Sequence, residues 1–147
     1  MTLLVSACLL GVGCRYDGEN KPNDAVLALL GRHTLIPVCG EVMGGLPTPR
    51  VPSERRGDSV INAEGADVTA EYRRGAAEVA RLAHLYGAKI AILKERSPAC
   101  GSGQIYDGTF THTLTAGWGV TAEALGQHGV AVYGESQVPR LVEQGIL

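Results

Sequence analysis

Three cysteines, Cys8, Cys39 and Cys100, each stand at or shortly after the end of a short apolar segment. Such segments predict buried strands, and parallel strands bring their carboxyl ends to one edge of a sheet. We therefore expect the three thiols to converge on one patch. Three thiolates suit a soft metal, either zinc or an iron–sulfur cluster, and a four-iron cluster held by three cysteines keeps one iron open to a ligand. The alternative is inert burial, since cysteine is among the most buried residue types.

Cys14 is a candidate fourth ligand, although its spacing from Cys8 matches no compact metal-binding motif. The first residues lack the basic segment and the apolar length of a signal peptide. No stretch approaches the ~20 apolar residues of a membrane span. We therefore expect a cytoplasmic protein, in which cysteines are ligands or nucleophiles more often than disulfide partners.

The loop at residues 94–103 combines several groups that could take part in chemistry. It offers the Cys100 thiol, the hydroxyls of Ser97 and Ser102, and glycines that let backbone N–H groups approach a ligand closely. A polar, glycine-rich loop at the carboxyl end of a buried strand is a common binding site in α/β proteins. A turn around an incidental buried cysteine is the alternative.

The elements that must position these residues alternate between strands and helices. We expect strands at 3–7, 34–38, 59–62, 88–93 and 130–133, and helices at 24–32, 67–86, 121–127 and 138–144. Their order predicts a three-layer, Rossmann-like α/β fold with a small, mostly parallel sheet, in a single domain spanning residues 1–147. Pro37 lacks a backbone donor, which places its strand at a sheet edge or a bulge. Residues 40–58, with three prolines and three arginines, predict a long, stiff, partly polyproline-like excursion.

The composition excludes several classes of partner. Of the 147 residues, 45% are hydrophobic and 19% are charged, as in a soluble globular protein. The net charge of −2 provides no basic footprint for nucleic acid or for an anionic membrane. We therefore expect a small-molecule ligand, no nucleic-acid or membrane partner, and a monomer or a small homo-oligomer.

Five short blocks follow one another along residues 5–133: VSACLLG (5–11), CRYDG (14–18), PVCGE (37–41), GGLPTPR (44–50) and SPACG (97–101). Together they resemble the thiouracil desulfidase family, long catalogued only as a bacterial domain of unknown function. The resemblance implies a [4Fe-4S] cluster held by Cys8, Cys39 and Cys100, with the fourth iron free for the sulfur of the substrate. It also implies that Cys14 is not a ligand. Ala99 stands where the family commonly has Ser.

The reaction implied by the resemblance is the non-redox conversion of 2-thiouracil, or a similar thiolated pyrimidine, into uracil and hydrogen sulfide. A soft thiocarbonyl sulfur suits an open iron, which would make the carbon electrophilic. Glu41, two residues after Cys39, is our candidate general base, and Ser97 is the candidate for hydrogen bonding or proton relay at the reacting centre. Gly40 stands where the family commonly has Pro and loosens the segment before Glu41. In the plainer alternatives, Glu41 pairs with Arg50 and Ser97 starts a turn.

Four further residues are candidates for binding the pyrimidine carbonyls. They are Lys94, Ser102 and the backbone amides of Gly101 and Gly103. A solvated position at the rim is the plainer interpretation of Lys94. His112, between two threonines, is a weaker alternative base.

Two other functions are compatible with the same residues. In a sulfurtransferase, Cys100 would carry a persulfide and no metal would be needed. In a metal-binding or redox-sensing module, the thiols would hold a metal without catalysis. Colour separates the persulfide enzyme, which is colourless and active, from a desulfidase with an iron–sulfur cluster, which is brown when purified without air. Brown protein whose fourth iron is occupied would favour the sensing module.

Overall fold

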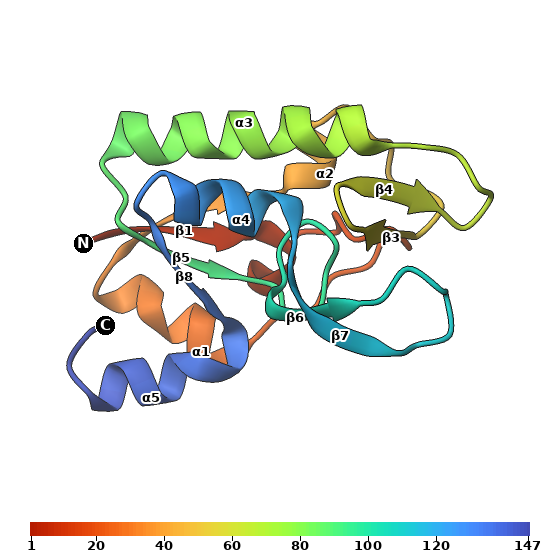
Figure 1. Ribbon diagram of the computed structural model, residues 1–147. Helices are drawn as coiled ribbons and strands as arrows, with labels where there is room; N and C mark the ends of the chain where they lie inside the picture. Colours follow the sequence, from red (N-terminus) through yellow and green to blue (C-terminus); the bar gives the residue numbers. More distant parts are fainter.

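The computed structural model describes residues 1–147, and its centre is a four-stranded parallel sheet with the strand order β2-β1-β5-β8 (Figure 1). The strands are β1 (Thr2–Ser6), β2 (Thr34–Val38), β5 (Ile90–Leu93) and β8 (Ala131–Gly134). The two central strands, β1 and β5, carry runs of apolar residues because helices cover both faces of the sheet. Pro37 lies in β2 at one edge, as its missing donor predicts.

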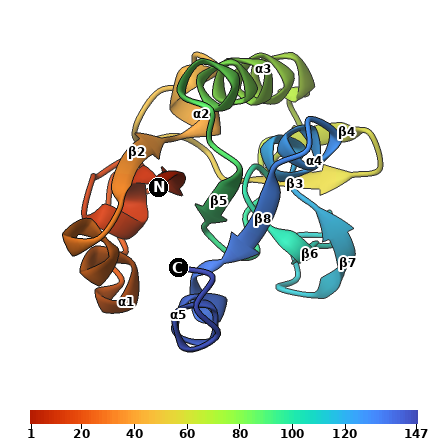
Figure 2. The same ribbon diagram turned by 90° about the vertical axis from the view of Figure 1, so that its left-hand side faces the viewer.

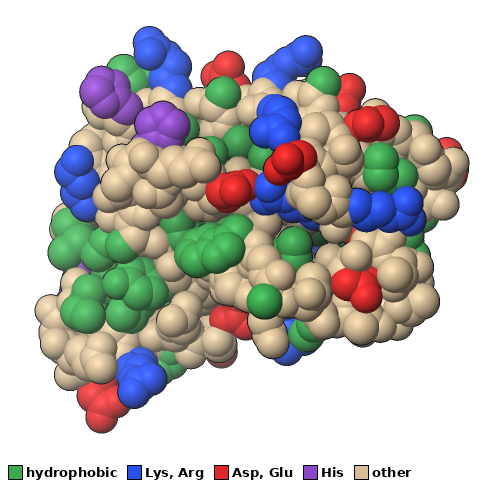
Figure 3. Space-filling model, in the orientation of Figure 1, with side chains coloured by type: hydrophobic (Ala, Val, Ile, Leu, Met, Phe, Trp, Pro, Cys, Tyr) green, Lys and Arg blue, Asp and Glu red, His purple; other side chains and the backbone are tan.

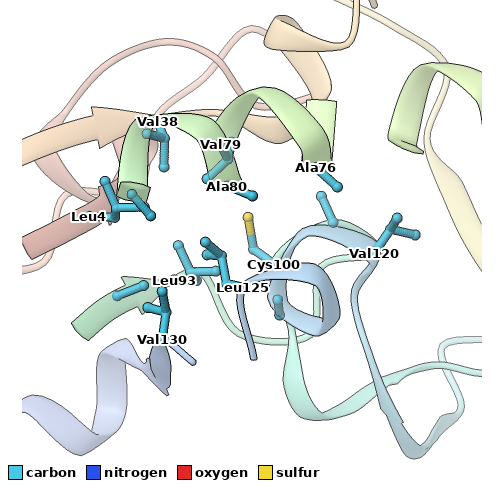
Figure 4. Close-up of a cluster of buried hydrophobic side chains, with 14 of the residues drawn as sticks. Leu4, Val38, Ala76, Val79, Ala80, Leu93, Cys100, Val120, Leu125 and Val130 are labelled. Carbon is cyan, nitrogen blue, oxygen red and sulfur yellow. The ribbon is translucent and has the colours of Figure 1, made fainter. Parts of the chain in front are cut away.

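Helices on both faces complete the three predicted layers (Figure 2). They are α1 (Asp24–Leu27), α2 (Gly40–Met43), α3 (Thr69–Tyr86), α4 (Val120–Gln127) and α5 (Val138–Glu143). Alternate residues of β1 point to opposite faces. Leu3 and Val5 pack with α1 and α5, while Leu4 packs with α3 and α4. Figure 4 shows the cluster beneath α3 and α4, with Cys100 among its side chains.

The predicted helix at residues 24–32 is divided. α1 ends at Leu27 and a 3-10 turn continues over Ala28–Gly31. Asn23 caps the start as expected, because its Oδ1 accepts the N–H of Val26 at 3.1 Å.

Two antiparallel hairpins correct the sequence-based expectation. β3 (Ser53–Arg56) pairs with β4 (Ser59–Asn62), and β6 (Ser102–Tyr106) pairs with β7 (Leu114–Trp118). The prediction of an irregular excursion over residues 40–58 is therefore wrong at both ends, where α2 and β3 form. Strand β3 consists of polar residues, and strands β6 and β7 carry glycines. None of the three has the apolar alternation of a half-buried strand, so the sequence pattern does not indicate the hairpins.

The tip of the second hairpin is attached to the first through two charged side chains of β3. Glu54 Oε1 accepts the N–H groups of Gly108 at 2.9 Å and Phe110 at 3.1 Å. Arg56 Nε donates to the carbonyl of Gly108 at 2.6 Å. These bonds hold the segment between β6 and β7 against β3.

Glu54→Ala is therefore expected to release this tip. Loss of a charged acceptor leaves two amides without a partner, and a hydrogen bond to a charged group contributes about 1.5–3 kcal/mol. We expect amide hydrogen exchange at Gly108 and Phe110 to become at least about tenfold faster. Glu64→Ala removes an exposed carboxylate that makes no side-chain hydrogen bond and is the matched control. Equal exchange in the two variants would show that Glu54 does not hold the tip.

Charged side chains of both signs are interspersed over α3 and the hairpins on the face shown in Figure 3, and apolar side chains gather near the two termini. No helix is both long enough and apolar enough to cross a membrane.

Candidate functional site

The carboxyl ends of β1, β2 and β5 meet at the point where the sheet changes its direction of growth. From β1 the chain adds β2 on one side and later β5 on the other. Such a switch point opens a crevice that commonly holds ligands. A cavity of about 320 Å³ lies here, within the ~300–1,000 Å³ typical of ligand pockets. The structure thus brings Cys8, Cys39 and Cys100 together on the lining of one cavity.

A different local structure places each of these thiols. Cys8 lies in the 3-10 turn Ala7–Leu10 directly after β1, and Cys39 is the residue that precedes the first turn of α2. Cys100 lies in a turn after β5. The N–H group of Cys100 donates to Ser97 Oγ at 3.1 Å. Because all three turns follow parallel strands, the sheet fixes the relative positions of the thiols.

Cys14 also lines this cavity, although the family resemblance places it outside the ligand set. Its thiol is buried, and the neighbouring thiols of Cys39 and Cys8, together with burial, act on its pKa, which is raised. The Cys39 thiol is also directed at the Cys14 carbonyl oxygen, at a distance of 3.9 Å. The cavity therefore presents four sulfur atoms.

The thiol environment fits a sulfur-ligated centre. Burial raises the pKa of Cys100 to about 12, and the neighbouring Cys14 thiol together with burial raises the pKa of Cys39. Both thiols are therefore protonated in the chain alone at neutral pH, so binding a metal centre releases protons. No group of three or more His, Cys, Asp or Glu side chains encloses a single metal ion. Thiolates are the donors by which proteins hold iron–sulfur clusters, and the cavity lining supplies several thiols.

Glu41, on α2, lines the same cavity. Its Oε2 accepts a hydrogen bond from Arg50 Nε at 3.3 Å and another from the Tyr72 hydroxyl. The expected alternative, a pair with Arg50, is thus observed together with a position on the cavity. Burial and the neighbouring Glu41 carboxylate raise the pKa of Tyr72, which keeps the phenol neutral. Burial by itself lowers the pKa of Arg50, but the charge and the hydrogen bond of Glu41 raise it by more. The net pKa of Arg50 is therefore raised, and its side chain stays charged.

Glycines fix α2 against α3. A Cβ at Gly75 would collide with the carbonyl of Gly40, and a Cβ at Gly44 would collide with the carbonyl of Glu71. Gly40 itself is buried against the hydroxyl of Thr121. The expectation that Gly40 loosens the segment before Glu41 is wrong, because it lies in the first turn of a tightly packed helix.

Ser97 and Lys94 both line the cavity but have structural partners. Ser97 Oγ accepts the N–H groups of Ala99 and Cys100, both at 3.1 Å, so it shapes the turn as the plainer alternative states. The hydroxyl proton of Ser97 stays available for donation. Lys94 Nζ donates to Glu135 Oε1 at 2.8 Å, so the ammonium group is paired with a carboxylate and is not simply solvated at the rim.

The other predicted substrate-binding residues do not line the cavity. Gly101 is held in the turn by its bond to the Ser97 carbonyl at 2.9 Å, and Ser102 and Gly103 pair with β7. The structure therefore does not bring these three residues together with the thiols.

Several cavity residues were not identified from the sequence. Ser6, at the end of β1, accepts the N–H of Lys94 at 2.8 Å and lies beside the Cys100 thiol. Tyr106 lies on the second hairpin, and its ring meets that of His112, the weaker alternative base, edge to face with the ring centroids 6.0 Å apart. The position of Ser6 two residues before Cys8 is a signal that could have been used, whereas no local signal indicates Tyr106.

The segment at residues 47–56 borders the cavity, as its length and stiffness predict. Four of its residues line the cavity: Arg50, Pro52, Ser53 and Glu54.

Comparison with known proteins agrees with this geometry. A solved structure described as the [4Fe-4S]-dependent thiouracil desulfidase TudS (DUF523Vcz) is 45% identical in sequence, has a TM-score of 0.89, and matches over 99% of both chains. The uncharacterized protein YbbK of Bacillus subtilis (strain 168) is 40% identical over 146 residues, which cover 92% of this chain and 97% of that protein. Residues 3–137 match the family described as 2-thiouracil desulfurase. With its cavity of cysteines at the switch point, the chain belongs to the 2-thiouracil desulfurase family.

Proposed function

We propose that this protein is a [4Fe-4S]-dependent desulfidase that acts on 2-thiouracil or a similar thiolated pyrimidine. Water replaces the thiocarbonyl sulfur, so that one C=S bond becomes one C=O bond and the sulfur leaves as hydrogen sulfide without net oxidation or reduction. The observation that carries this proposal is the convergence of several cysteine thiols and the Glu41 carboxylate on one cavity at the switch point of a desulfurase-family fold.

Cys8, Cys39 and Cys100 are the proposed ligands of the cluster, because each follows a parallel strand that ends at the cavity. When bound, the cluster supplies a soft Lewis acid for the sulfur of the substrate. Cys14 is proposed to remain a thiol beside this site.

Glu41 is the proposed general base. Both of its hydrogen bonds are made by Oε2, so Oε1 is left for a water molecule. A carboxylate within hydrogen-bonding reach of the attacking water can accept its proton in the transition state. Ser97 is proposed to donate its hydroxyl proton to the reacting centre, since its Oγ is already fixed by two backbone N–H groups.

The pyrimidine is proposed to lie between the thiols and the opposite wall of the cavity. Lys94 lines the cavity and is the proposed partner of a ring carbonyl, and the β6–β7 hairpin contributes Tyr106 and His112. Gly101, Ser102 and Gly103 do not line the cavity, so Lys94 is the proposed substrate-binding residue among the four candidates.

The environment of Cys100 argues against the persulfide alternative. Reactive cysteines lie in partly exposed, electropositive surroundings that lower their pKa. Cys100 is buried, and burial raises its pKa to about 12. A thiol in this state is a poor nucleophile and a suitable ligand once a metal displaces its proton.

Isotope-labelled water tests the proposed reaction. Anaerobically purified protein is mixed with 2-thiouracil in H₂¹⁸O, and uracil and sulfide are quantified. We expect one labelled oxygen in each uracil and one sulfide for each thiouracil consumed. Unlabelled uracil, or sulfur that is held as a cysteine persulfide after a single turnover, would refute hydrolytic desulfuration.

A further inference from the structure

Arg50 is a buried arginine whose side chain is only 4% exposed. Its guanidinium donates to four acceptors: Nε to Glu41 Oε2 at 3.3 Å, NH1 to the Pro47 carbonyl at 3.2 Å and to Thr48 Oγ1 at 3.1 Å, and NH2 to the Cys14 carbonyl at 2.7 Å. The fixed fork of the guanidinium thus joins three separate pieces of chain around the cavity.

We propose that Arg50 is the positioning residue for Glu41: it anchors one carboxylate oxygen so that the other is aimed at the reacting water. This inference rests on the proposed role of Glu41 as general base. Arg50 acts through Glu41 and through the fold around the cavity, and its own donors are already engaged.

The carboxylate geometry supports anchoring at a single oxygen. Tyr72 donates to the same Oε2 from α3, so two donors converge on one oxygen and the plane of the carboxylate is restrained. The close contact of α2 with α3 brings the Tyr72 hydroxyl to Glu41, since any side chain at Gly75 would separate these helices. A restrained carboxylate is already in reacting geometry and needs no reorganisation during the reaction.

The same guanidinium fixes the loop that carries Cys14. Besides the NH2 bond to the Cys14 carbonyl, the backbone N–H of Arg50 donates to the Tyr16 carbonyl at 2.7 Å. Arg50 therefore fixes the distance between α2 and the loop that carries Cys14 and Tyr16. Lysine has the same charge but a single donor head, and cannot make the Glu41, Thr48 and Cys14 bonds together.

A double-mutant cycle tests this role. Arg50→Lys is expected to lower kcat on 2-thiouracil at least about tenfold, with a change in KM of less than about threefold, because the displaced base acts mainly in the transition state. In a Glu41→Gln background the same Arg50→Lys change is expected to alter kcat by less than about twofold. Arg81→Lys, on the exposed face of α3, is the control and is expected to match the wild type.

Thermal unfolding of the apoprotein provides a second readout that needs neither cluster nor activity. We expect Arg50→Lys to lower Tm when Glu41 is present and to lower it clearly less in Glu41→Gln, since the two residues contact each other. Tyr72→Phe removes one donor to the same oxygen while keeping the ring. It is expected to lower kcat severalfold with an unchanged KM, and it keeps the test usable if Arg50→Lys does not fold.

Three results would overturn the inference. They are an equal loss of kcat from Arg50→Lys in both backgrounds, an effect on KM alone, or equal Tm losses in both backgrounds of the apoprotein. A wild-type protein that does not act on 2-thiouracil would instead refute the proposed function, and the apoprotein cycle would still decide whether Arg50 and Glu41 are coupled.

Discussion

Alanine at any one of Cys8, Cys39 and Cys100 is expected to reduce the iron content of anaerobically purified protein from about four atoms per chain to near zero. A four-iron cluster that is held by three thiolates loses an iron ligand when one of them is removed, and we expect the cluster to be lost. Desulfurase activity is expected to fall below detection in all three variants. Iron and acid-labile sulfide analysis, together with the visible absorbance, measure the effect.

Cys14→Ala is the matched control, because Cys14 is buried on the same cavity and loses the same atom. We expect it to keep the iron content, the brown colour and much of the activity. Loss of iron in Cys14→Ala equal to that in the other three variants would show a site with four protein ligands. The proposal of an iron open to the substrate would then be wrong.

The second large effect is expected at the general base. Glu41→Gln keeps the shape of the side chain, and its amide can still accept hydrogen bonds from Arg50 and Tyr72. We therefore expect full cluster content and near-normal binding of 2-thiouracil, with turnover at least about 10²-fold slower, a typical loss for a general base. Single-turnover kinetics and a direct binding titration separate the two quantities.

Glu78→Gln, at an exposed position on α3, is the control for the change of charge and is expected to behave as wild type. Ser97→Ala is expected to show the pattern of Glu41→Gln more weakly, because loss of one hydrogen-bond donor costs at most a few kcal/mol. If Glu41→Gln retains full turnover with full cluster content, Glu41 is not the base. His112, which lines the same cavity, is then the residue to test.

The parallel sheet and the meeting of the three thiols were predictable from the sequence. Short apolar runs such as that of β5 have few alternatives to a buried strand. Once the strands are parallel, residues that follow them share one edge of the sheet. The sheet topology alone therefore predicts that Cys8, Cys39 and Cys100 lie on one cavity. No knowledge of side-chain contacts is required.

The contacts of Glu41 could be predicted only in part. The pair with Arg50 is one of the alternatives that the sequence offers, because the two residues carry opposite charges, and the structure contains it. Helical periodicity places Tyr72 on the apolar side of the helix at 67–86, and its ring is in the core. The direction of its hydroxyl depends on how closely α2 approaches α3, which is decided by glycines in both helices and has no periodic signal.

The positions of Ser102 and Gly103 could not be predicted because the chain leaves the cavity after Cys100. Their pairing with β7 directs them into a hairpin whose partner strand has no apolar alternation. Sequence patterns detect strands by the face that they bury, so a hairpin with few buried residues escapes them. The same hairpin brings Tyr106 back to the cavity.

The most direct test of cluster-dependent desulfuration is the rate of 2-thiouracil turnover as a function of iron content in one protein preparation. Apoprotein is reconstituted anaerobically to several levels of iron and sulfide, and uracil formation is measured at each level. We predict that the rate rises in proportion to the [4Fe-4S] content and is absent from colourless apoprotein. Full turnover by colourless, iron-free protein would contradict the cluster-dependent reaction and favour a persulfide on Cys100.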